Sequence, residues 1–244
     1  MDINQKITEE LGVKKWQVDA AVKLIDEGNT IPFIARYRKE AHGTLDDEQL
    51  RKLYERLTYL RNLEEKKEQV LASIEEQGKL TPELKAQIVA AETQVLVDDL
   101  YRPYRPKRRT RATIAKEKGL EPLAVLISLQ NSKEPLEKEA EKYVSEEKGV
   151  KNVQEAIDGA KDILAENISD EADYRKRIRD LTFKKGTLVS AAKDEKAESV
   201  YEMYYDFTEA VSKVAGHRVL ALNRGEKEKF LSVKTVSYTH LRAH

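Results

Sequence analysis

Residues 46–91 read DDEQLRKLYERLTYLRNLEEKKEQVLASIEEQGKLTPELKAQIVAA and decide the fold class that we expect for this chain. Apolar side chains recur through residues 46–77 at the three- and four-residue spacing of one helix face. They are Leu50, Leu53, Leu57, Leu60, Leu71 and Ile74. Glu64 and Lys67 stand where this stripe should continue, and Gly78 is placed to end the helix. The pattern predicts one long amphipathic helix.

A second helix is predicted directly after the first. Thr81 supplies an N-cap side chain, Pro82 suits the first helical turn, and Glu83 places an acid near the positive end of the helix. Apolar residues then continue the helical spacing from Leu84 to Val95. Together the two segments predict an antiparallel helical hairpin.

Composition extends this expectation to most of the chain. Charged residues make up 36% of the 244 residues, with only 10 glycines and 6 prolines, which is typical of long solvent-exposed helices. Near the N-terminus the apolar spacing stops at Gly12 and resumes at Trp16, which predicts a helix-turn-helix-like pair. Only residues 219–233 have the character of a strand. We therefore expect a mainly α, elongated multi-helix assembly with a short β segment near the C-terminal end.

The overall charge gives the chain no preference for polyanions. Forty-four basic and forty-four acidic residues cancel, so such a preference must come from a local cluster. There is no cysteine, and no stretch approaches the roughly 20 apolar residues that a membrane helix needs. We expect a cytoplasmic protein with no membrane partner, no cofactor and no small-molecule substrate.

The densest basic segment, residues 101–111, reads YRPYRPKRRTR. Pro103 and Pro106 disfavour helix and are expected to hold it extended as a loop, with guanidinium groups presented to phosphates and tyrosines to unpaired bases. The predicted nucleic-acid-binding residues are Tyr101, Arg102, Tyr104, Arg105, Lys107, Arg108, Arg109 and Arg111. The alternative is that these basic side chains pair with carboxylates of neighbouring helices.

A secondary basic cluster lies in residues 31–40, IPFIARYRKE. Its apolar half, Ile31, Phe33 and Ile34, is expected in the core. Its basic residues are Arg36, Arg38 and Lys39. They are candidates for phosphate contact, although acids close by in the sequence favour an internal ion-pair network.

No signature of catalysis or metal binding is present in the sequence. The four histidines are His42, His217, His240 and His244. They do not combine with nearby acids into a persuasive metal site, and there is neither a nucleophile-elbow serine nor a glycine-rich phosphate loop. We expect no metal site and no enzyme activity.

Three strings occur in the order and at the separations seen in one protein family: NTIPFIARYRKEAHGTLDDEQLR, DDLYRPYRPKRRTRATIAKEKGLEPLA and GHRVLALNRGEKE. From about Ile3 to about Lys234 the chain resembles the N-terminal region of the Tex family of bacterial transcription accessory proteins. The resemblance implies a chain cut off before a ribonuclease-H-like domain, helix-hairpin-helix elements and the S1 RNA-binding domain, to which the family's nucleic-acid binding is chiefly attributed.

The resemblance also implies four segments. A helix-turn-helix-like part (1–45) leads into a central helical region (46–215) with the basic loop at 101–111, and then into the start of an incomplete segment (216–234). The last residues, 235–244, read TVSYTHLRAH and depart from the family pattern, so we expect a non-native or disordered tail.

Two functions follow from these expectations. The first is a non-catalytic transcription accessory fragment that binds RNA or DNA weakly through the basic segment, with RNA polymerase or ribosome-associated proteins as further partners. The second is a helical protein-protein interaction scaffold for the transcription or translation machinery, with no nucleic-acid binding of its own.

Overall fold

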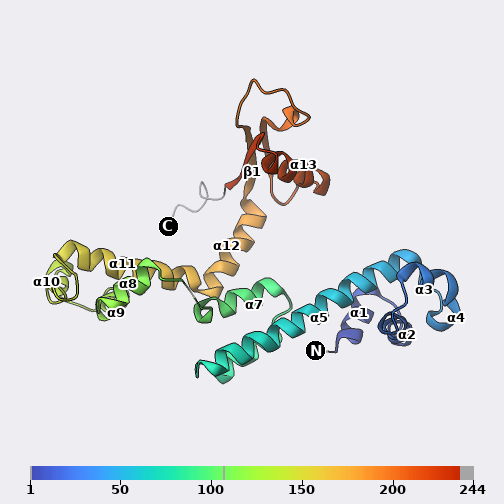
Figure 1. The fold of residues 1–244 in the computed structure, drawn as a ribbon, viewed down its shortest axis with the longest axis horizontal. Helices are drawn as coiled ribbons and strands as arrows, with labels where there is room; N and C mark the ends of the chain where they lie inside the picture. Colours follow the sequence, from blue (N-terminus) through green and yellow to red (C-terminus); the bar gives the residue numbers. More distant parts are fainter. Residues whose placement is uncertain (1, 107, 237–244) are drawn as a thin grey trace. The chain divides into compact units, whose positions relative to one another are not determined.

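The computed structural model describes residues 2–106 and 108–236 (Figure 1). Within these residues it contains thirteen α-helices and one three-stranded antiparallel sheet near the C-terminus, so the prediction of a mainly α protein is confirmed. The chain divides into two compact units, Met1–Pro106 and Lys107–His244. Residues 237–244 of the predicted tail lie outside the described residues, and the predicted domain boundaries stay a prediction.

The first unit is helical throughout. Its helices are α1 (Ile3–Leu11), α2 (Lys15–Asp26), α3 (Ile31–Tyr37), α4 (Lys39–His42), α5 (Asp47–Glu76), α6 (Pro82–Ala90) and α7 (Gln94–Tyr101). The predicted turn between α1 and α2 forms at Gly12, which has a φ of 65°. This left-handed conformation favours glycine over any side chain.

The long helix α5 begins and ends where its sequence predicts. The Asp46 carboxylate accepts a hydrogen bond from the Gln49 backbone N–H at 2.7 Å, and the Gln49 side chain accepts one from the Asp46 N–H at 3.0 Å. This reciprocal capping box satisfies two backbone donors at the start of the helix. Gly78, with a φ of 66°, turns the chain away at the other end.

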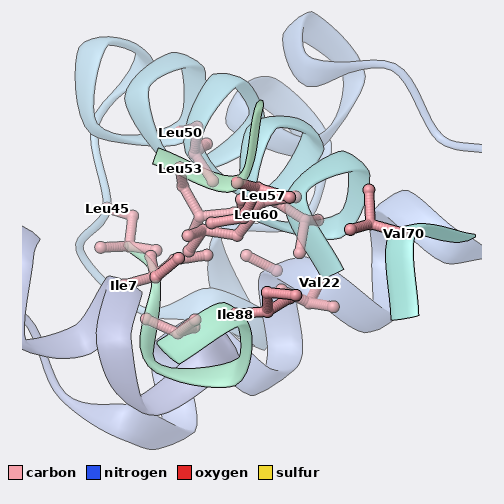
Figure 2. Close-up of a cluster of buried hydrophobic side chains, with 14 of the residues drawn as sticks. Ile7, Val22, Leu45, Leu50, Leu53, Leu57, Leu60, Val70 and Ile88 are labelled. Atoms are coloured by element: carbon pink, nitrogen blue, oxygen red, sulfur yellow. The ribbon is translucent and has the colours of Figure 1, made fainter. Parts of the chain in front are cut away.

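The apolar stripe of α5 forms the centre of the first core. Figure 2 shows Leu57 and Leu60 in one cluster with Ile7 of α1, Val22 of α2 and Ile88 of α6. All five side chains are buried. Helices that precede α5 in the sequence and a helix that follows it therefore share one core.

The helix predicted to run from Pro82 to Val95 is interrupted. Thr81 caps α6 as predicted, with its hydroxyl accepting from the Leu84 N–H at 3.2 Å. However, α6 ends at Ala90, and Thr93 caps a new helix, α7, by accepting from Leu96 N–H. Ala91 is extended and lies buried in the first core, so α6 does not continue through it.

The second unit contains a helical core and a smaller sheet. Its helices are α8 (Arg111–Glu117), α9 (Glu121–Leu129), α10 (Leu136–Glu141), α11 (Val153–Asp170), α12 (Ala172–Lys185) and α13 (Gly216–Lys227). Leu120, Leu123 and Ile163 lie fully buried in the helical core. Its alanines and Gly159 let α8 and α11 pack closely.

The sheet has the strand order β2-β1-β3, with both neighbours antiparallel to β1. Its strands are β1 (Thr187–Ala192), β2 (Asp206–Ala210) and β3 (Leu231–Val236). The prediction of a strand from residue 219 was wrong, because α13 is a helix that buries Leu222 and Gly225 against Leu231 and Tyr201. Only the end of the predicted range, from Leu231, is a strand.

Candidate nucleic-acid interface

The basic segment, residues 101–111, is less extended than its prolines predict. Tyr101 ends α7, Arg102–Tyr104 form one turn of 3-10 helix, and Arg111 begins α8. Pro103 fits within the turn because the missing N–H has no partner to lose there. The segment crosses from the first unit to the second after Pro106.

In the first unit, the tyrosines of the segment lie against the core. The hydroxyl groups of Tyr101 and Ser73 are 3.0 Å apart, and Gln77 donates to the Tyr104 backbone oxygen at 2.9 Å. Both tyrosine rings are half-buried. Arg105 lies over the Tyr101 ring, 5.5 Å from its centroid, and donates to Asp98 at 2.8 Å. Only part of each ring is therefore open to a base.

In the second unit, the remaining arginines of the segment surround the start of α8. Arg109 donates to Glu117 at 2.7 Å, and Arg111 forms an ion pair with Asp162 of α11 at 3.2 Å. Arg108 is exposed and has no ion pair with any residue that the structure describes. Lys107, the other basic residue of the predicted site, lies outside the described residues.

The ion pairs of the segment leave its charges accessible. The side chains of Arg105, Arg109 and Arg111 are 53%, 68% and 86% exposed. Pairs in such positions contribute only about 0.2–1 kcal/mol, because water and salt screen them. A phosphate oxygen can therefore replace the carboxylate at little cost. Arg102 is exposed as well and engages a neighbouring group.

The secondary basic cluster has an aromatic component that the sequence did not predict. Ile34 is buried as expected, but Phe33 and Tyr37 are exposed beside the predicted bases Arg36, Arg38 and Lys39. The expectation that Phe33 lies in the core was wrong. Phe33 and Tyr37 are one helical turn apart on the side of α3 that points away from Ile31 and Ala35, and this spacing was the signal available.

Helix α12 is a third basic surface, and sequence reasoning missed it. None of its residues is buried. Its bases are Arg175, Lys176, Arg177, Arg179, Lys184 and Lys185, against the two acids Asp173 and Asp180. The charge run was visible in the sequence, but its exposure was not.

The second unit also carries an apolar groove of about 520 Å³ between α9 and the junction of α11 with α12. Four of its lining side chains are exposed apolar or aromatic groups: Val125, Leu129, Ile168 and Tyr174. Glu121 and Glu171 also line it. A groove of this kind is typical of a surface that receives another protein segment.

The histidines and acids are dispersed through the described parts of both units. His42 is fully buried, and its Nε2 lies 3.2 Å from the Ile34 backbone oxygen. No three His, Asp or Glu side chains among the described residues are placed to hold a metal ion. His240 and His244 lie outside those residues. No described helix is long and apolar enough to cross a membrane.

Two family models match the chain on either side of the basic segment. Residues 1–75 match the Tex-like protein N-terminal domain, and residues 130–242 match the Tex central region-like model. The chain belongs to the Tex family. The predicted resemblance is thereby confirmed, and the two Tex models together match more than half of the chain.

Several curated proteins align with nearly the whole chain. It is 50% identical over 234 residues to the uncharacterized protein YdcI of Bacillus subtilis, covering 95% of this chain and 32% of the relative. It is 44% identical to the transcriptional accessory protein Tex of Neisseria gonorrhoeae, covering 96% and 31%. It is 30% identical to the human S1 RNA-binding domain-containing protein 1, covering 96% and 24%. The chain thus spans about a third or less of these relatives.

Proposed function

We propose that this chain is a non-catalytic part of a transcription accessory protein and that its basic segment holds the phosphate backbone of RNA or DNA. The exposure of its guanidinium groups carries the proposal, because Arg105, Arg109 and Arg111 are more than half exposed despite their ion pairs. Arginine suits phosphate through planar, bidentate hydrogen bonds. The segment offers only a few such contacts, so the binding is weak and sensitive to salt.

The names of two relatives support the setting. The Neisseria gonorrhoeae relative is named as a transcriptional accessory protein, and the human relative is named for an S1 RNA-binding domain. We extend the proposal to RNA polymerase or ribosome-associated proteins as partners. We also propose a cytoplasmic location, since transcription takes place there in bacteria such as those of several relatives.

The test is a titration of fluorescent single-stranded RNA and of a DNA duplex with the whole chain at about 50 and 200 mM salt. One variant has Arg105, Arg108, Arg109 and Arg111 changed to Gln. A control variant loses the same charge from Arg51, Lys52, Lys138 and Lys161, which are also exposed and ion-paired. Circular dichroism establishes that both variants fold.

The proposal expects salt-sensitive binding that only the first variant loses. Each lost phosphate contact should reduce the slope of log affinity against log salt by about 0.7–0.9. An equal loss in both variants would mean that net charge alone attracts the nucleic acid, and the segment would then have no special role.

The groove between α9 and α11 favours a second candidate function, the helical scaffold for transcription or translation proteins. Its exposed Val125, Leu129 and Ile168 offer apolar area that the described residues of the second unit leave uncovered. Absence of nucleic-acid binding by the folded wild-type chain would favour this candidate over the first.

A further inference from the structure

Helix α3 has one face in the core and one aromatic face in solvent. Ile34 is fully buried, and Ile31 and Ala35 pack against the same core. On the opposite face, Phe33 is 36% exposed and Tyr37 is 57% exposed. Burial of the exposed part of either ring is favourable, so a partner that covers this face would gain apolar contact area.

The two rings form a pair bordered by arginines. Their centroids are 5.4 Å apart with an angle of 46° between the ring planes. The Arg38 guanidinium lies 5.2 Å from the Phe33 centroid, and that of Arg36 lies 5.9 Å from the Tyr37 centroid. Two aromatic faces and two planar cations thus lie within about one helical turn.

The positive charges of this surface are poorly neutralised. Arg36 and Lys39 have no carboxylate within 4.0 Å among the described residues. The carboxylate of Glu40 is 3.9 Å from Arg38 and largely exposed. In contrast, Arg105 and Arg109 of the basic segment each donate to a carboxylate at 2.7–2.8 Å. The α3 surface therefore keeps more of its charge for an anionic partner.

The surface is also held in place before any partner arrives. Pro32 lies in the first turn of α3, where its fixed φ suits a helix start, and burial of Ile34 fixes the rotation of the helix about its own axis. The Ile34 backbone oxygen accepts the Arg38 N–H at 3.1 Å and lies 3.2 Å from Nε2 of buried His42. A preorganised surface loses little entropy on binding.

We propose that α3 and α4 form a binding site for single-stranded nucleic acid. An unpaired base stacks on the exposed part of Tyr37, with Phe33 beside it, while Arg36, Arg38 and Lys39 hold the flanking phosphates. The flat rings and adjoining cations match a ligand that alternates flat bases with anionic groups. An acidic peptide would use the cations but would leave the rings without a stacking partner. This site is separate from the basic segment and does not depend on its function.

The experiment compares the whole wild-type chain with the variants Tyr37→Leu and Phe33→Leu. Leucine keeps apolar bulk but removes the π face. Phe183→Leu is the matched control, because Phe183 is 60% exposed and lies in the second unit. The probes are a short fluorescent oligoadenylate RNA, the same sequence as DNA, and an abasic oligonucleotide of equal length. A duplex of the oligonucleotide with its complement is the fourth probe, and polyglutamate is the fifth. Thermal melting establishes that each variant folds.

We expect Tyr37→Leu to weaken binding of both single strands by roughly 5- to 100-fold, since one stacked base contributes that much. Phe33→Leu should weaken it less, whereas Phe183→Leu should have no effect. The wild-type chain should bind the abasic strand and the duplex more weakly than it binds the single strands. Tyr37→Leu should leave the binding of these two probes unchanged. A larger loss for RNA than for DNA would identify RNA as the ligand, and an equal loss would identify a site for either.

Undiminished oligoadenylate binding by folded Tyr37→Leu and Phe33→Leu variants would overturn the proposal. An equal loss of affinity for the abasic strand would also overturn it, because the rings would then act without stacking on nucleobases. Polyglutamate binding as tight as oligoadenylate binding would overturn it as well, because polyglutamate offers the anionic groups but no nucleobase. Loss of binding in the basic-segment variant alone would support the proposed function and refute this site. Loss in Tyr37→Leu alone would do the reverse.

Discussion

The ammonium group of Lys67 lies 2.9 Å from the backbone oxygen of Val89, in the last turn of α6, and is almost completely buried. It also donates to the Glu64 carboxylate at 2.8 Å. Carbonyl groups in the last turn of a helix have no partner within the helix, so Lys67 satisfies one of them. The two residues that interrupt the apolar stripe of α5 therefore join α5 to α6.

Shortening Lys67 should destabilise the first unit. Lys67→Ala removes both hydrogen bonds and the packing of the methylene stem, and we expect a cost of about 2–4 kcal/mol. Lys67→Met keeps the stem and should cost less than Lys67→Ala. Urea unfolding monitored by circular dichroism measures the difference. A Lys67→Met variant more stable than the wild type would show that burial of the ammonium group costs more free energy than its hydrogen bonds return.

Acid should weaken two ion pairs of the first unit. The hydrogen bond from Arg56 lowers the pKa of Glu10 below its usual 4.5, and that from Arg61 lowers the pKa of Asp26 below its usual 3.8. A carboxylate whose pKa is lower in the folded chain stabilises the fold above its unfolded pKa. This contribution is lost as the pH falls through the folded value.

The variant Arg56→Gln tests this dependence. At pH 7 we expect it to lower the free energy of unfolding by about 0.5–1 kcal/mol, because the pair is partly exposed. The difference in the free energy of unfolding between the variant and the wild type should shrink as the pH falls below about 4.5. It should disappear once Glu10 is protonated in both the folded and the unfolded chain. A difference that stays constant down to pH 2 would mean that Arg56 acts only through packing.

A methyl group at Gly225 should destabilise the sheet region. A Cβ there would lie 2.6 Å from Cδ1 and 2.9 Å from Cγ of Leu231, and 3.1 Å from Cδ1 of Tyr201. Both neighbours are buried, so we expect Gly225→Ala to cost about 1–3 kcal/mol, more than the helix propensity of alanine returns. Gly216→Ala, on the same helix but in open space, should be neutral or stabilising. Thermal melting of both variants distinguishes the two effects.

Removing a competing carboxylate should strengthen binding by the basic segment. Glu117→Gln releases Arg109 from its 2.7 Å pair, and we expect roughly 1.5- to 5-fold tighter RNA binding at low salt. Glu146→Gln is an exposed control with the same change of charge, and its effect gives the contribution of net charge. Equal effects of the two substitutions would contradict a direct role for Arg109.

Local signals determined the helices that the sequence predicted well. Asp46, Gln49 and Gly78 act within a few residues of the ends of α5, so the ends of that helix were readable from the sequence. The motifs that carry the family resemblance are likewise contiguous. The sequence alone was therefore enough for the mainly α fold and for membership of the Tex family.

Only the tertiary structure decided which charges are paired and which rings are exposed. Arg111 finds Asp162 on a helix far along the chain, and neither its spacing nor its neighbours in the sequence predict that pair. The segment 216–227 became a helix because Leu222 and Gly225 pack against Leu231 and Tyr201. The sequence predicts Phe33 as a core residue. In the structure, burial of Ile34 fixes the rotation of α3 and leaves Phe33 exposed. Apolar residues compete for the same limited interior, and only packing between distant segments determines which of them remain at the surface.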